Sequence, residues 1–275
     1  MYILSGGEHV LGRLVFKISV GFVTGALILL AVSLYLSNLY LKEQLRLAEI
    51  GNLRGAWDKV QLAARLDPFG SEPLAAKAYL ELRQGNTNEA IEALQEAIAR
   101  DPANYRNYAT LGNVQRQQLG DPEAAAQSYR EALERNPRAS TVVYGLGEAL
   151  LSSEDLEGAR EQYEWLREQG NIPLRGLYNL GEIQTRLGEP EEAIKTFEEA
   201  KEGADAGGES LEDSQREQFL RSLELAIADA LVVQGSYDEA REALLQSSSD
   251  QAPARLALLD DPESYRMSVL EGRIS

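Results

Sequence analysis

One short pattern recurs along this chain at nearly constant spacing, and it constrains the fold more than any other feature. In each copy a Gly, or in one case a Glu, is followed five residues later by an Ala. The first five of these Ala residues are 34, 35, 34 and 34 residues apart, and a sixth follows after 47. Self-similarity at such a period indicates stacked structural repeats rather than a single globule. The six residues are Ala56, Ala90, Ala125, Ala159, Ala193 and Ala240.

Other positions recur with the same period. A Leu-Gly pair precedes the Gly position in three copies, and an aromatic residue follows the Ala by four positions in those copies (Tyr129, Tyr163 and Phe197). This spacing predicts hairpins of two helices of about 13 residues, in which small residues let the helices approach closely. One hairpin cannot bury its apolar face alone, so the copies are expected to stack. A Pro closes each of the first three copies, at Pro68, Pro102 and Pro137.

This pattern resembles the tetratricopeptide repeat (TPR), a 34-residue helix–turn–helix motif. The resemblance covers residues 37 to about 205, and again about 221 to 248. It implies an all-α fold, a right-handed superhelix of about six hairpins over residues 37–248. A Gly-rich acidic insertion at about 202–213 is expected to form a loop, and residues 249–275 are expected to cap the last repeat.

The chain departs from the TPR pattern at a few positions. Lys77 stands where a Leu is usual, and one extra residue precedes Gly120. The fourth copy has Leu166 in place of the second Ala and Asn171 in place of the closing Pro.

A second feature lies ahead of the repeats. The 24 residues from Ile18 to Leu41 carry no charge and are flanked by Lys17 and Lys42. As a helix they span about 36 Å, enough to cross a hydrocarbon core of about 30 Å with some tilt. This predicts a single transmembrane helix at 18–41 after a tail at 1–17. The alternatives are a buried core helix and a signal peptide cleaved after a small-x-small site at 31–33, but the apolar run continues beyond that site.

The anchor and the first repeat share residues. Counting back from Gly51, the first repeat helix begins near Ser37, inside the apolar run, and no Pro lies between Ile18 and Ile50. We therefore expect one helix that leaves the membrane and becomes the first helix of the superhelix. The alternative is a short kink near Asn38.

Composition excludes several kinds of chemistry. The chain has no Cys, one His (His9) and a net charge of −17 from 27 basic and 44 acidic residues. Thiolate or multi-His metal sites are therefore absent, and a strongly acidic chain is a poor ligand for nucleic acid. We expect no enzyme activity, no cofactor, no metal and no nucleic-acid partner.

The resemblance also implies a concave groove lined by the first helix of each hairpin. Two Tyr residues recur there one repeat apart with Arg beside them, and both residue types are common anchors of interaction surfaces. We expect a protein or peptide partner, an extended segment or a helix that carries a carboxylate. The alternative is a solvated face with Glu–Arg pairs one turn apart on a helix. The groove residues are Arg106, Asn113, Arg116, Tyr144, Glu148, Arg175, Tyr178, Glu182 and Arg186.

One known TPR binding scheme, the carboxylate clamp for chaperone C-termini, is not supported. Asn113 fits that scheme, but Ala75 and Ala109 stand where its first Lys is expected.

Two functional classes remain open. The first is a non-catalytic membrane-anchored scaffold that binds protein partners and assists assembly of a membrane or envelope complex. The second is an accessory or regulatory subunit of an envelope polysaccharide or secretion machine that binds its substrate. Residues 64–68 and 97–105 are also similar to the repeat tails of bacterial O-antigen ligase and polymerase-type proteins, which implies an envelope setting.

The side of the membrane follows from two opposing signals. Two basic residues precede the apolar run and four follow it closely, which by the positive-inside rule favours repeats in the cytoplasm. A short tail before one apolar helix instead resembles a signal anchor, which exports the body. We expect a single-pass protein of the cell membrane with its repeats outside the cytoplasm.

Overall fold

The computed structural model describes residues 5–206 and 212–274, with side chains from Phe16 onward, and these residues form helices without any strand. The chain divides into two compact units within α5, Met1–Leu111 (unit 1) and Gly112–Ser275 (unit 2). The helices are α1 (Ser5–Glu49), α2 (Leu53–Leu66), α3 (Glu72–Arg83), α4 (Thr87–Arg100), α5 (Tyr105–Val114), η1 (Gln115–Leu119), α6 (Pro122–Arg135), α7 (Ser140–Ser152), α8 (Leu156–Glu168), α9 (Leu174–Arg186), α10 (Pro190–Asp205), α11 (Asp213–Gln234), α12 (Tyr237–Gln246), α13 (Ala252–Leu258) and α14 (Pro262–Leu270).

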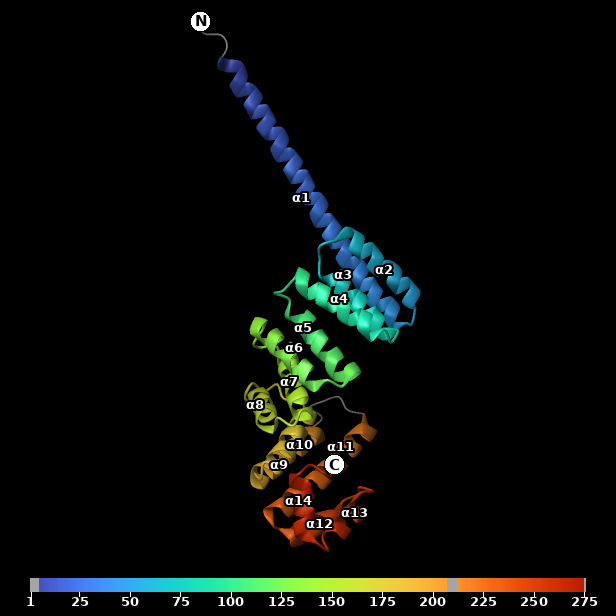
Figure 1. Cartoon of the computed structure of the whole chain (residues 1–275), viewed down its shortest axis with the longest axis vertical. Helices are drawn as coiled ribbons and strands as arrows, with labels where there is room; N and C mark the ends of the chain where they lie inside the picture. The colour runs from blue at the N-terminus through green and yellow to red at the C-terminus, as the bar shows by residue number, and fades with distance from the viewer. Residues whose placement is uncertain (1–4, 207–211, 275) are drawn as a thin grey trace. The chain divides into compact units, whose positions relative to one another are not determined.

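In unit 1, the apolar run and the first repeat helix form one helix. α1 is 45 residues long and continues through Asn38 without a break, which confirms the continuous helix. Figure 1 shows it leaving the helices α2–α4 as a bare rod. Its C-terminal part packs on α2, because Ser37 Oγ donates to the Ala63 carbonyl (3.1 Å) and Ser33 Oγ donates to the Leu66 carbonyl (2.7 Å).

The core of unit 1 lies between the end of α1, α2 and α3. Buried apolar residues from all three helices meet there: Leu47, Ala48, Ala56, Val60 and Leu80. The repeat position Ala56 is fully buried, so its small side chain lets α2 approach its neighbour closely.

In unit 2, each recurring aromatic residue packs against a recurring glycine. Phe197 on α10 is fully buried, and a Cβ on Gly181 of α9 would lie 2.4 Å from its Cε1 atom. Likewise, a Cβ on Gly147 would lie 3.1 Å from the Cζ atom of Tyr163. The Gly of each recurring Leu-Gly pair therefore leaves the space that the aromatic ring occupies.

The turn between the two helices of a hairpin explains the other glycine position. Gly188 has φ +78°, a left-handed conformation that glycine adopts without steric cost at a helix C-terminus. Glu154, the one substitute in this column, has φ +63°, which disfavours a residue with a Cβ. The extra residue before Gly120 coincides with η1, a π-helical turn of five residues.

The C-terminal part of unit 2 contains one long helix, α11, followed by three shorter ones, α12, α13 and α14. α10 ends at Asp205 and α11 begins at Asp213, so part of the predicted insertion at 202–213 lies outside the described residues. Ala252 of α13, Leu259 directly after it, and Tyr265 and Val269 of α14 form a cluster with apolar side chains of α11 and α12. α14 also lies against α9.

Candidate partner-binding groove

The predicted groove residues lie on first helices of the hairpins, and the structure divides them into groups. Arg106 belongs to unit 1, where it is exposed and its guanidinium lies 5.5 Å from the ring centroid of Tyr105. The other eight belong to unit 2, in η1 and on α5, α7 and α9.

The first group in unit 2 joins η1 to α7. Arg116 Nη2 lies 3.0 Å from Glu148 Oε2, and each of these side chains is 23% exposed. Tyr144, one turn before Glu148, packs edge-on against Tyr163 with ring centroids 5.9 Å apart. Burial and the Glu148 carboxylate raise the pKa of the Tyr144 hydroxyl to about 12. The charges of this group are therefore already paired within the chain.

Asn113 and Arg186 are also engaged internally. Asn113 Oδ1 accepts a hydrogen bond of 2.7 Å from the Tyr129 hydroxyl. Arg186 Nη2 forms an ion pair with Glu154, the residue of the left-handed turn. These ion pairs join neighbouring hairpins, whereas the alternative interpretation expected Glu–Arg pairs one turn apart on a helix.

The second group lines a cavity of about 620 Å³. Tyr178 and Glu182 form its α9 wall, and the facing wall comes from α11 and from the segment 248–255. The Tyr178 ring packs 5.9 Å from Phe197 and 6.3 Å from Phe219, centroid to centroid, so its orientation is fixed. Arg175 is exposed and lies outside the lining.

Glu182 carries the most perturbed carboxyl pKa on this wall. Burial, reinforced by the negative charge of Asp229, raises its pKa to about 7, although Arg255, Arg186 and a hydrogen bond from Tyr178 act in the opposite direction. Among the described residues Glu182 makes no ion pair within salt-bridge distance, unlike Glu148 at the equivalent position of the preceding repeat.

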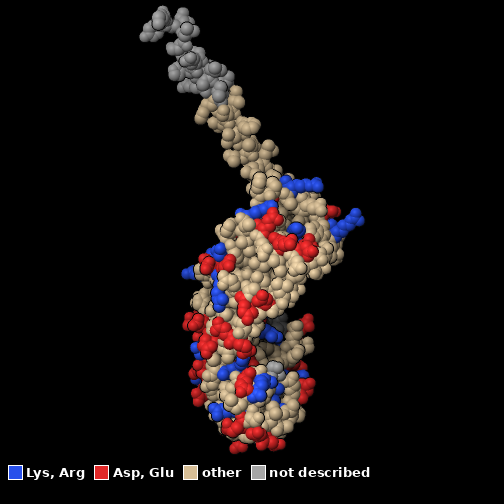
Figure 2. Space-filling view, in the orientation of Figure 1, with Lys and Arg blue, Asp and Glu red and all other residues tan. Residues whose placement is uncertain are grey.

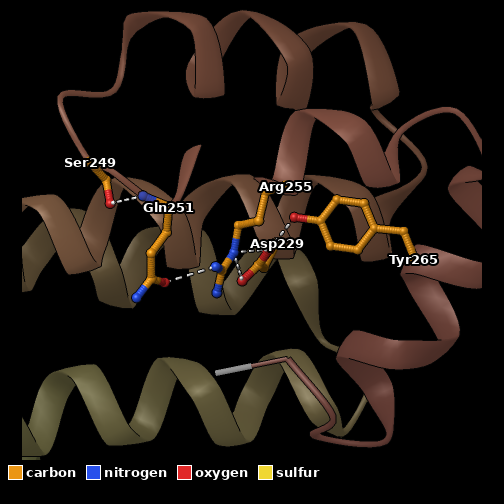
Figure 3. Close-up of polar contacts among 5 residues, drawn as sticks. All are labelled: Asp229, Ser249, Gln251, Arg255 and Tyr265. Atoms are coloured by element: carbon orange, nitrogen blue, oxygen red, sulfur yellow. Dashed lines mark hydrogen bonds and ion pairs between the residues drawn. The ribbon is translucent and has the colours of Figure 1, made fainter. Parts of the chain in front are cut away.

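The floor of the cavity is a buried polar network (Figure 3). Arg255 Nε donates to both carboxylate oxygens of Asp229, at 3.1 and 3.2 Å, and the Tyr265 hydroxyl donates to Asp229 Oδ1. On the other side of the guanidinium, Arg255 Nη1 donates to Gln251 Oε1 at 3.1 Å. Asp229 and Arg255 are 6% and 8% exposed, so this network ties α13 and α14 to α11. Burial raises the pKa of Asp229 although Arg255 favours its charged form.

The end of the chain covers part of this surface. Ile274 lines the cavity, and Gly272 lies so close to Arg186 that a Cβ there would be 2.9 Å from the Arg186 Cζ. The cavity is thus bounded by the chain's own C-terminal segment on one side and remains open on another.

Sequence reasoning missed the α11 wall, although the repeat contained the signal. Glu182 lies six residues before the turn glycine Gly188, and the residue six before Gly235 is Asp229. Tyr178 lies ten residues before Gly188, and the residue ten before Gly235 is Leu225, which also lines the cavity. Applying the groove positions to the sixth repeat would have found this wall. Arg255 gave no such signal because it follows the last repeat.

The side chains that line the cavity offer hydrogen bonding and charge pairing. Among the described residues, no three His, Cys, Asp or Glu side chains are grouped so that they could hold a metal ion. His9 lies outside the residues whose side chains are described.

Comparison with known proteins agrees with this architecture. A tetratricopeptide repeat family model matches residues 75–118, 115–171 and 144–209. The chain therefore contains tetratricopeptide repeats, and its helical architecture is that of TPR proteins.

Two of the similar proteins belong to pilus systems. The type IV pilus assembly protein PilF of Pseudomonas aeruginosa is 29% identical over 136 residues, which is 46% of this chain and 52% of PilF. Its solved structure matches with a TM-score of 0.60 at 22% identity, covering 77% of this chain and 90% of that one. The structure of PilW, described as a type IV pilus biogenesis factor, matches with a TM-score of 0.59 at 14% identity, covering 80% and 98%.

A third similar protein is unrelated to pili by name. The CTR9 homolog of Arabidopsis thaliana is 27% identical over 133 residues, 46% of this chain and 12% of that protein. This chain thus spans about half of PilF and a small part of the CTR9 homolog, and the shared feature is the repeat.

Proposed function

We propose that this chain is a non-catalytic, membrane-anchored TPR scaffold that binds a segment of a protein partner during assembly of a membrane or envelope complex. The observation that carries the proposal is the cavity of about 620 Å³ between α9 and α11, lined by Tyr178, Glu182 and Asp229. A rigid aromatic ring beside hydrogen-bonding groups is typical of a surface that anchors a peptide. The likeness to PilF supports an assembly role rather than the substrate-binding subunit.

The charges favour a partner segment with a basic side chain. The sequence suggested a carboxylate partner because Arg residues recur in the groove. Arg116 and Arg186, however, are neutralised by Glu148 and Glu154. Glu182 has no such ion pair with any residue that the structure describes, so a Lys or Arg of the partner would gain a charge-assisted hydrogen bond there and restore the ionised carboxylate.

The anchor is proposed from α1. The helix is long and apolar enough to cross a membrane, and its most apolar window has no protein cover. Outside α1, large apolar side chains this exposed occur singly among the described residues. An uncovered apolar surface of this length is stable in lipid and costly in water.

Photo-crosslinking in cells tests the groove. A benzoylphenylalanine residue replaces Tyr178 on the groove wall, or Lys195 on α10, whose side chain is 65% exposed, as the matched control. We expect a discrete crosslinked protein from position 178 and none from position 195, and Glu182→Lys should abolish the product. Equal products from both positions, or a product that survives the charge reversal, would remove the groove from the proposal.

A further inference from the structure

The tip of the α2–α3 connection in unit 1 carries an exposed apolar side chain that the repeat does not explain. Phe69 is 87% exposed, more than any other large apolar side chain that the structure describes. It stands at the turn Asp67–Gly70, which is tight because a Cβ on Gly70 would lie 2.0 Å from Asp67 Oδ2. The ring therefore points away from the fold.

Hydrogen bonds fix the depth of this turn along α1. Ser37 donates to the Ala63 carbonyl and Ser33 to the Leu66 carbonyl, so α2 runs antiparallel to α1 and ends beside Ser33. Phe69 follows Leu66 by three residues and so lies within about 10 Å of that point.

Because α2 packs against α1 from Ser33 onward, it covers one side of the last residues of the predicted span 18–41. Lys17 is the last charge before the apolar run, and a hydrocarbon core of about 30 Å takes about 20 helical residues. Counting 20 residues from Ile18 ends at Ser37, where α2 already lies alongside. Ser33, beside which α2 ends, comes four residues before Ser37, so the end of α2 and its turn lie about 6 Å to the hydrocarbon side of that point, near the boundary with the headgroups.

Three carbonyl groups at or next to this turn, those of Leu66, Pro68 and Gly70, accept hydrogen bonds from side chains of the protein. Ser33 bonds the Leu66 carbonyl, and Arg100 Nη1 donates to the carbonyls of Pro68 and Gly70, at 2.8 and 3.3 Å. In an aqueous loop such groups can bond water, whereas at a membrane an unpaired carbonyl is costly. These hydrogen bonds therefore lower the cost of placing the turn where water is scarce.

We propose that the turn at residues 67–70 inserts Phe69 into the membrane interface and so forms a second contact of unit 1 with the bilayer. This rests on the proposed anchoring by α1. The contact fixes the first hairpin against the membrane surface instead of leaving it free to swivel about a single helix. Basic and acidic side chains both occur at this end of unit 1, Arg65 and Arg100 with Asp67 and Asp101, and Figure 2 shows both colours beside the rod. The contact therefore depends on the apolar ring and not on anionic lipid.

The test uses the absence of cysteine from the sequence, which makes every introduced thiol unique. Full-length chain with Leu29→Cys, Phe69→Cys or Asn88→Cys is labelled with the environment-sensitive dye NBD and reconstituted into phosphatidylcholine vesicles. Position 29 reports insertion of α1. Position 88 is the control for the dye itself, because it is exposed in the first turn of α4, which follows the far end of α3, and α3 is about 18 Å long.

We expect labels at 29 and 69 to emit at shorter wavelength and to be quenched by lipids brominated on their chains, with stronger quenching at 29, and the label at 88 to stay unquenched. Quenching at 29 without quenching at 69 leaves the anchor standing and overturns the second contact. Equal quenching at 69 and 88 also overturns it, because the dye would then partition by itself. An unquenched label at 29 contradicts the anchor and the contact together.

Discussion

Gly181 on α9 faces Phe197 on α10 so closely that a Cβ on the glycine would lie 2.4 Å from the ring. No real Cβ contact is that short, so the two residues form one packing unit. The ring is fully buried and cannot move aside without displacing its own helix. The recurring Leu-Gly and aromatic positions of the sequence are thus two halves of one contact.

Gly181→Ala should destabilise unit 2. Alanine favours a helix by about 1 kcal/mol over glycine, but overpacking against Phe197 costs about 1–3 kcal/mol, so a net loss of stability is expected. Gly147→Ala is the matched comparison, because its Cβ would meet Tyr163 at 3.1 Å and smaller shifts suffice. In urea unfolding followed by circular dichroism, Gly181→Ala should be less stable than Gly147→Ala. The reverse order would contradict the packing described.

Glu182 should make stability depend on pH in a direction unusual for a carboxylate. Its folded pKa of about 7 is above the ordinary value of 4.5, so the folded state binds the proton more tightly. Stability from this group is complete below pH 4.5 and is lost as pH rises through 7, by at most about 3 kcal/mol.

Glu182→Gln isolates this effect. The variant should be more stable than the wild type at pH 8 and close to it at pH 4.5, as measured by urea midpoints across that range. If the difference in urea midpoint between Glu182→Gln and the wild type is the same at every pH, Glu182 does not titrate in this window.

The Asp229 network should behave as a unit. Asp229→Ala leaves Arg255 buried without its partner, which costs about 3–5 kcal/mol. Tyr265→Phe removes one hydrogen bond to the carboxylate and keeps the ring, so about 1.5–3 kcal/mol is expected. The double change Asp229→Leu with Arg255→Met should cost less than the sum of the single changes, since no buried charge remains. Additive losses in thermal unfolding would contradict the coupling.

Much of the fold could be predicted because each hairpin repeats the same local code. One repeated pattern predicts the turn at Gly188, the close helix contact at Ala193 and the packing of Phe197 on Gly181. The Asp229–Arg255–Tyr265 network could not be predicted, because Arg255 and Tyr265 follow the last repeat and have no counterpart in earlier copies. The pairing of Arg116 with Glu148 was not predicted either: the sequence suggested Glu–Arg pairs one turn apart on a helix, and its spacing does not say which side chains meet across two hairpins.

The repeats should lie outside the cytoplasm. Protease added to intact spheroplasts should digest the repeat region of the full-length chain and leave a fragment containing α1. The control is a cytoplasmic protein that stays intact in the same sample. Protection of the repeats, with digestion only after lysis, would place the groove in the cytoplasm.

A charge exchange between Glu182 and its partner tests whether the groove binds the partner through this carboxylate. Once crosslinking from position 178 identifies the partner residue, co-isolation is measured for Glu182→Lys, for the partner's Lys or Arg changed to Glu, and for both together. We expect each single change to lower recovery of the complex and the double change to restore it. Recovery unaffected by Glu182→Lys, or a double change no better than the singles, would contradict the groove as the binding site.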